Sequence, residues 1–188
     1  MAPIMTATSS RWTVERLERE GPPDGLWELI DGELIAMSPS GRAAGKLAVW
    51  IGSLLLGFVL PHRLGEVFGA DTGFVLVPGR QLLRSPDVAF VRADRLVAQD
   101  DRGYLHLAPD LAIEVRSPTD RTPDVLAKIE LYREAGVRLV WLVDPDPRTV
   151  AVFGGGQDGR VLQGGDWLDG GDVLPGLRID LAELFRPL

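Results

Sequence analysis

The chain has 188 residues, of which 45% are hydrophobic, no cysteine and a formal net charge of −7. This length can bury one good core but is small for two, so we expect one domain over residues 1–188, with residues 1–10 flexible. The missing cysteines exclude disulfides and thiolate metal sites, and the acidic balance argues against a protein whose main task is to coat nucleic acid.

The N-terminal part predicts a short helix, a hairpin and a long helix. Thr13 can cap a helix over residues 14–20, which ends at a glycine- and proline-rich cluster. Residues 26–30 and 33–37 have strand patterns and are joined by Asp31-Gly32, a strong hairpin signal because both turn positions favour positive φ. Apolar residues at helical spacing predict a long helix over residues 41–62 with one buried face.

The rest of the chain predicts short strands and one further long helix. Residues 66–70, 73–77, 86–91 and 110–115 are the expected sheet core, and a helix follows from residue 120 or 122 to residue 135. Residues 137–143 are apolar nearly throughout, as in a central strand covered on both faces. A strand at 149–153, a glycine-rich stretch over 154–176 and a last helix over 179–184 complete the prediction.

Nothing in the sequence indicates a membrane or an export signal. The longest apolar stretch, residues 47–60, is interrupted by Gly52, Ser53 and Gly57 and falls short of the roughly eighteen residues of a spanning helix. The first ten residues lack the basic start and long apolar middle of a secretory signal. We therefore expect a cytoplasmic protein with no membrane partner.

Two carboxylates within predicted strands are the main functional signal. Alternate residues of a strand point to opposite faces, so Glu114 shares a face with Ala112 and Arg116, and Asp87 shares one with Ala89. If the two strands are neighbours, the acids converge at one end of the sheet, where they repel unless a cation sits between them. Magnesium, a hard ion with oxygen ligands, fits that role. The alternative is two unrelated surface acids at strand ends.

Lys128 adds an independent signal from the predicted second helix. Drawn at roughly 100° per residue, it falls on the apolar side, between Leu131 and Tyr132. Either its stem lies on the apolar surface and its ammonium reaches water, or the carboxylates hold the ammonium. In the second case Lys128 would orient or activate the attacking water and stabilise charge on a phosphate. The three residues then indicate a metal-dependent phosphodiesterase.

Short motifs along most of the chain carry a resemblance to a known family. They are Glu28-Leu29-Ile30-Asp31-Gly32-Glu33-Leu34, Met37-Ser38-Pro39, Pro86-Asp87-Val88, Pro109 to Val115 with Ser117-Pro118, Lys128 with Leu131-Tyr132, Ala135-Gly136-Val137, and Trp141 to Pro145. With them the chain resembles the Uma-two family of restriction endonucleases, within the PD-(D/E)XK nuclease superfamily. The resemblance implies an α/β fold with a restriction-endonuclease-like core, a central mixed β-sheet flanked by helices, with an N-terminal hairpin and a C-terminal β-rich extension.

The resemblance also implies roles for site residues. Asp87 and Glu114 match the first two acidic positions and hold the metal, with the backbone carbonyl of Val115 as a further ligand. The superfamily lysine lies two residues beyond the second acid, where this chain has Arg116. Arginine stays protonated and is a poor general base, so we expect Lys128 to be the displaced catalytic lysine and Arg116 to bind substrate phosphate. The alternative is that Arg116 replaces the lysine electrostatically.

Two further positions depend on the resemblance. Glu33 is a candidate metal ligand, because early acidic residues of the family are implied to approach the same metal; the alternative is a solvent-facing residue beside the hairpin turn. Relatives often carry a histidine near the start of the long helix, and residues 41–46 contain none. Neither His62 nor His106 has a matching context.

The leading prediction is an enzyme, a magnesium-dependent endonuclease that hydrolyses phosphodiester bonds of DNA, with manganese able to substitute. Cleavage of both strands would favour a two-fold homodimer. A second hypothesis is a catalytically inactive relative that acts as a nucleic-acid-binding or protein-interaction module. A third is hydrolysis of a small phosphorylated molecule by the same residues.

Overall fold

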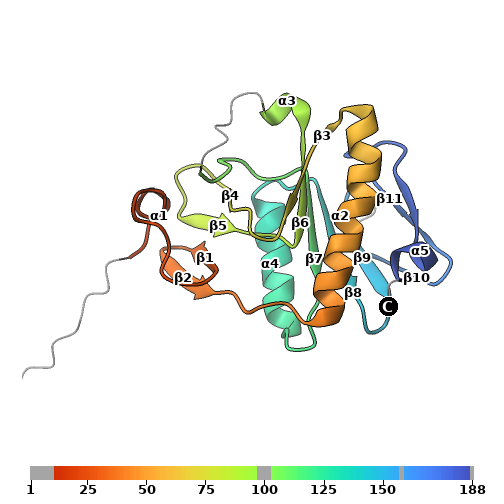
Figure 1. Ribbon diagram of the computed structural model, residues 1–188, viewed down its shortest axis with the longest axis horizontal. Helices are drawn as coiled ribbons and strands as arrows, with labels where there is room; N and C mark the ends of the chain where they lie inside the picture. Colours follow the sequence, from red (N-terminus) through yellow and green to blue (C-terminus); the bar gives the residue numbers. More distant parts are fainter. Residues whose placement is uncertain (1–10, 97–102, 157–158, 187–188) are drawn as a thin grey trace, which may run out of the picture.

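The computed structural model describes residues 11–96, 103–156 and 159–186, so the expectation for residues 1–10 lies outside the described residues. The helices are α1 (Val14–Glu20), α2 (Arg42–His62), α3 (Ala93–Leu96), α4 (Thr122–Glu134) and α5 (Leu181–Leu184). The strands fall into three sheets of six, four and two strands (Figure 1).

The six-stranded sheet is the centre of the fold. Its strand order is β10-β9-β8-β7-β6-β3, from β10 (Arg160–Gln163), β9 (Thr149–Gly154), β8 (Leu139–Asp144), β7 (Leu111–Val115), β6 (Val88–Arg92) and β3 (Gly65–Gly69). Strands β7 and β8 are parallel and the other neighbours are antiparallel, with α4 in the connection between β7 and β8. The mixed sheet predicted from the resemblance is confirmed.

The two long helices cover opposite faces of this sheet (Figure 1). Leu47 and Ile51 of α2 belong to a core that includes Ile113 of β7. On the other face, Tyr132 of α4 packs in a core that includes Ala112 of β7. Because Ala112 and Ile113 are consecutive in β7, they point to opposite faces, as strand alternation requires.

The smaller four-stranded sheet has the order β2-β1-β5-β4 and is made of β1 (Trp27–Ile30), β2 (Glu33–Ala36), β4 (Phe74–Val75) and β5 (Leu82–Arg84). Asp31 and Gly32 both have positive φ, which confirms the predicted hairpin turn. Leu17 of α1 packs on this sheet beside Leu29 of β1.

Two sequence expectations for this region were wrong. The chain from residue 73 was expected in the main sheet, but β4 lies in the smaller one, and β5 was not predicted at all. Strands of two and three residues are too short to show a clear period in the sequence.

The C-terminal part forms the β-rich extension that the resemblance implied. Strand β11 (Trp167–Asp169) pairs with β12 (Arg178–Asp180), and both pack with α5 on the α2 side of the main sheet. The last helix was expected over residues 179–184 but begins at Leu181, because Ile179 pairs with Leu168 and Asp180 caps the helix by accepting from the Ala182 amide at 2.9 Å.

Helix α2 is the one described helix that is long and apolar enough to cross a membrane by length and composition. Leu47, Ile51 and Leu55 on one face of α2 are fully buried, whereas Val49, Leu56 and Leu60 are exposed. From the sequence we expected no membrane-spanning segment, because we considered only residues 47–60. The helix extends beyond both ends of that stretch.

Candidate active site

Asp87 and Glu114 lie at the same end of the main sheet, as the strand patterns predicted. Asp87 immediately precedes β6, which pairs with β7 in a register that places Val88 opposite Ile113. The Val115 amide donates to Asp87 Oδ2 at 2.7 Å, so the first acid is tied to the residue that follows the second.

Lys128 reaches this pair from α4. Its Nζ lies 2.9 Å from Glu114 Oε2, and its side chain is only 19% exposed. The ammonium is therefore held by carboxylate rather than extended into water. Tyr132, one helical turn further on, donates its hydroxyl to Glu114 Oε1 at 2.7 Å. Residues four apart in a helix share a face, so α4 supplies one hydrogen bond to each oxygen of Glu114.

Glu28 is a third acid of this site, and sequence reasoning missed it. Its Oε1 lies 3.3 Å from Lys128 Nζ and accepts from the Ser85 amide at 3.1 Å, while its other oxygen accepts from the Arg84 guanidinium. Glu28 is 5% exposed, because β1 lies between β2 and β5. The sequence held the same signal that identified Glu114, namely an acidic residue within a predicted strand, here beside Leu29.

The structure does not bring Glu33 to the site. Glu33 is exposed at the start of edge strand β2, beside the hairpin turn, and no ion pair joins it to Lys128 among the described residues. The acid that α4 meets is Glu28, so the expectation for Glu33 as a metal ligand is replaced by the solvent-facing alternative.

Arg116 lies on the α4 side of the sheet, the face of Glu114, as strand alternation predicted, but its guanidinium is held by other partners than Glu114. Strand β7 ends at Val115, and the Arg116 guanidinium lies 3.0 Å from Asp144 Oδ2 and donates to Thr122 Oγ1 at 2.8 Å. Asp144 is the last residue of β8, and Thr122 is the first residue of α4. Arg116 therefore braces the rim of the site and does not replace Lys128 beside Glu114.

Burial and charge set the protonation of the cluster. Burial raises the pKa of Glu114 to about 7, in spite of the attraction of Lys128. Burial also raises the pKa of Asp87, against the hydrogen bond from the Val115 amide. For Glu28 burial alone would raise the pKa, but the charges of Lys128 and Arg84 outweigh it and the pKa is lowered.

Lys128 stays protonated at neutral pH. Burial alone would lower its pKa, but the charges of Glu114 and Glu28 outweigh burial, and the pKa is raised. A protonated ammonium stabilises negative charge but does not accept a proton. The site thus combines one permanent cation, Lys128, with two acids of raised pKa. A further positive charge beside Asp87 and Glu114 would favour the ionised form of both.

Asp87 and Glu114 are of the ligand type that a magnesium ion takes. Carboxylate oxygens are the ligands this ion takes, and it uses one or two carboxylates with water completing its shell. Each oxygen of Glu114 accepts one hydrogen bond and keeps a second lone pair. Among the described residues, no group of three acidic, histidine or cysteine side chains is placed to hold a metal ion.

The comparisons with known proteins agree with this fold. A crystal structure described as that of a putative nuclease belonging to DUF820, from Anabaena variabilis ATCC 29413, has a TM-score of 0.78 and 21% sequence identity to this chain, covering 93% of this chain and 98% of the other. This chain therefore has the same α/β fold as that protein. No curated protein matches the chain. The model of the Uma2 family, described as putative restriction endonuclease, matches residues 13–182, and the chain belongs to this family.

Proposed function

We propose that this protein is a magnesium-dependent endonuclease that hydrolyses phosphodiester bonds of DNA. The observation that carries the proposal is the placement of Lys128 Nζ 2.9 Å from Glu114, on the sheet end where Asp87 also lies. Membership in a family described as putative restriction endonuclease supports nucleic acid as the substrate class. Asp87 and Glu114 would hold the magnesium ion, with the Val115 carbonyl as a further ligand.

The side chains divide the remaining work. A bound magnesium ion would polarise the phosphate and supply an attacking water of lowered pKa. Lys128, kept protonated by Glu28 and Glu114, stabilises the negative charge that grows on the phosphate oxygens. Tyr132 holds Glu114 in one orientation through its hydroxyl. Arg116, at the rim, offers the part of its guanidinium not used by Asp144 and Thr122 to a neighbouring phosphate.

The test is cleavage of supercoiled plasmid DNA with magnesium, with manganese and with a chelator. Glu114→Gln and Asp87→Asn are each expected to abolish cleavage while the protein stays folded by circular dichroism. Glu130→Gln is the matched control, because Glu130 lies on the solvent-facing side of the same helix that carries Lys128. Cleavage that survives both site substitutions, or that proceeds equally in chelator, would reject the proposal.

The same experiment separates the other two functions. A folded protein that shifts DNA in a gel without cutting it would be the catalytically inactive nucleic-acid-binding module. Release of phosphate from small phosphate esters that depends on Glu114, with DNA left intact, would favour the small-molecule hydrolase. The two-fold dimer stays a prediction, checked by sedimentation of the protein with and without duplex DNA.

A further inference from the structure

The Lys128 ammonium lies between two carboxylates that belong to different sheets. Its Nζ is 2.9 Å from Glu114 Oε2 in the main sheet and 3.3 Å from Glu28 Oε1 in the four-stranded sheet. An ammonium has three N–H donors and no acceptor. The two acids can take two of these donors, and Lys128 has no third partner among the described residues. One donor is therefore left for an oxygen of the substrate.

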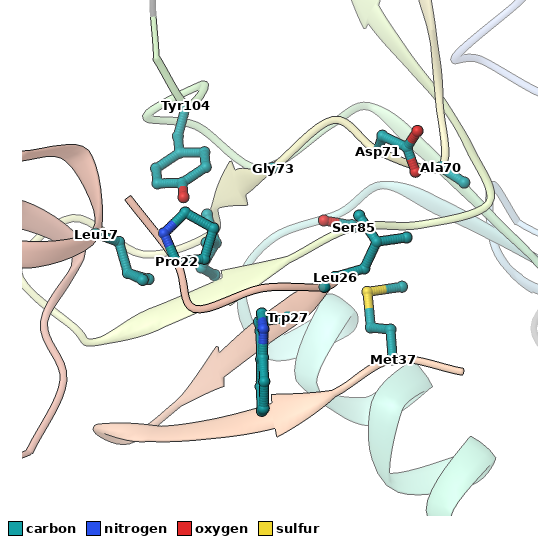
Figure 2. Close-up of a pocket in the computed structure, with 12 residues that line it drawn as sticks. Leu17, Pro22, Leu26, Trp27, Met37, Ala70, Asp71, Gly73, Ser85 and Tyr104 are labelled. Carbon is teal, nitrogen blue, oxygen red and sulfur yellow. The ribbon is translucent and has the colours of Figure 1, made fainter. Parts of the chain in front are cut away.

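Glu28 faces Lys128 because of the strand alternation in β1. Its neighbour Trp27 lines a hollow on the opposite side of the four-stranded sheet, together with Leu17 of α1 and Tyr104 (Figure 2). Successive residues of a strand point to opposite faces, so Glu28 points to the side on which α4 lies. There it is 5% exposed and reaches the Lys128 ammonium.

The Glu28 carboxylate is fixed by contacts other than the one with Lys128. Its Oε1 accepts from the Ser85 amide at 3.1 Å, and its other oxygen accepts from the Arg84 guanidinium. Both donors belong to the end of β5 and the residue after it, and β5 pairs with β1. With these contacts the carboxylate keeps its place when the partners of Lys128 change.

Glu114 is a different kind of partner for Lys128. Each of its oxygens accepts one hydrogen bond, from Lys128 and from Tyr132, and the proposed function also assigns this carboxylate to a magnesium ion. An ammonium and a divalent cation repel each other, so Glu114 alone would not keep Lys128 in place beside a bound ion. Glu28 is the second carboxylate that the ammonium already contacts.

We propose that Glu28 is a positioning residue that holds the Lys128 ammonium at the site, so that Glu114 is free to bind a cation and the third N–H faces a phosphate oxygen. The cation and the phosphate in this inference rest on the proposed nuclease function. The contact between Glu28 and Lys128 is independent of that function, and so is its test without magnesium.

The sequence offers a direct probe of this contact, because Lys46 and Lys128 are its two lysines. The full chain is labelled with nitrogen-15 at lysine Nζ, and Lys46→Arg assigns the Lys128 ammonium signal by NMR. Exchange of the ammonium protons with water reports how firmly the carboxylates hold them. In Glu28→Gln this exchange is expected to be at least about tenfold faster, the value of one hydrogen bond between charged groups. With saturating magnesium the unmodified protein should keep slow exchange, and Glu28→Gln should not.

Arg84→Gln is the matched control. It breaks the same buried ion pair as Glu28→Gln, but it leaves the Glu28 carboxylate beside Lys128 and in contact with the Ser85 amide. The Lys128 ammonium should therefore keep the slow exchange of the unmodified protein. If Glu28→Gln does not fold, the double variant with Arg84→Gln takes its place, because it leaves no uncompensated buried guanidinium. Slow exchange retained without Glu28, or equally fast exchange in Arg84→Gln, would overturn the inference.

Cleavage assays separate this inference from the nuclease proposal. Slow exchange that depends on Glu28, in a protein that cuts no DNA with magnesium, would reject the nuclease and leave Glu28 as the residue that holds Lys128. Magnesium-dependent cleavage, together with Lys128 exchange that does not respond to Glu28→Gln, would retain the nuclease and reject the positioning role.

Discussion

The Tyr132 hydroxyl donates to Glu114 Oε1 at 2.7 Å, while the Lys128 ammonium lies 2.9 Å from the other oxygen of the same carboxylate. Both donors come from one face of α4, one turn apart. Hydrogen bonds to both oxygens fix the orientation of the Glu114 carboxylate. Tyr132 is therefore a positioning residue that acts through Glu114, a proposed metal ligand.

Replacing Tyr132 by phenylalanine removes this hydrogen bond and keeps the aromatic ring. We expect Tyr132→Phe to lower magnesium affinity about tenfold or more, as substitutions behind a metal ligand do, measured by calorimetric titration without nucleic acid. The chain has two tyrosines, so Tyr104→Phe is the matched control and should keep the affinity of the unmodified protein. Equal affinities in all three proteins would show that Tyr132 does not position Glu114 for metal binding.

The positions of Lys128 and Arg116 predict unequal effects on cleavage. Lys128→Met removes the ammonium beside Glu114 and is expected to slow DNA cleavage at least about a hundredfold, the usual loss on removing a group that stabilises transition-state charge. Arg116→Met removes a rim contact with Asp144 and should cost less than about tenfold. Single-turnover rates at saturating magnesium decide between them. The reverse order would restore Arg116 as the replacement for the lysine.

The raised pKa of Glu114 predicts how stability depends on pH. Its pKa is about 7 in the folded protein, against an ordinary value of 4.5. Between these pH values the folded state binds more protons than the unfolded state, so the free energy of unfolding falls as pH rises. The fall is at most roughly 3 kcal/mol and levels off above pH 7. Urea denaturation in chelator across pH 4.5 to 8 measures it.

Two controls belong to that measurement. Glu114→Gln cannot ionise at this position, so it should flatten the pH dependence relative to the unmodified protein. Saturating magnesium favours the ionised carboxylate and should reduce the fall in stability above pH 6. The same slope in Glu114→Gln would assign the titration to other groups.

The ion pair between Glu28 and Arg84 predicts a large stability effect. Both side chains are almost fully buried, and Arg84 Nε has no hydrogen-bond partner among the described residues. Glu28→Gln leaves this guanidinium buried without its counter-charge, and we expect a loss of about 3 kcal/mol in the free energy of unfolding. Asp31→Asn breaks the exposed pair with Arg80 and should change stability little. Similar small losses in both variants would contradict the prediction.

Local periodicity was enough to predict the side-chain direction of three residues of the candidate site. Alternation in the strands around Asp87 and Glu114 determined that each acid points away from the α2 core, and the helical period of residues 122–134 placed Lys128 on the packed side of α4. Each of these inferences concerns the direction of a side chain from its own element. That direction depends on backbone geometry that repeats over a few residues.

The remaining contacts needed the tertiary structure. Glu28 became part of the site because β1 pairs with β5, a strand of three residues more than fifty positions away, and this pairing brings Arg84 and Ser85 beside it. Arg116 does not pair with Glu114 because Asp144 of β8 and Thr122 of α4 hold its guanidinium. The sequence by itself thus determined which way the acids and the lysine face. Which elements meet, and therefore which charges share one buried volume, was decided only by the packing of the whole chain, because strand pairing joins residues with no local pattern in common.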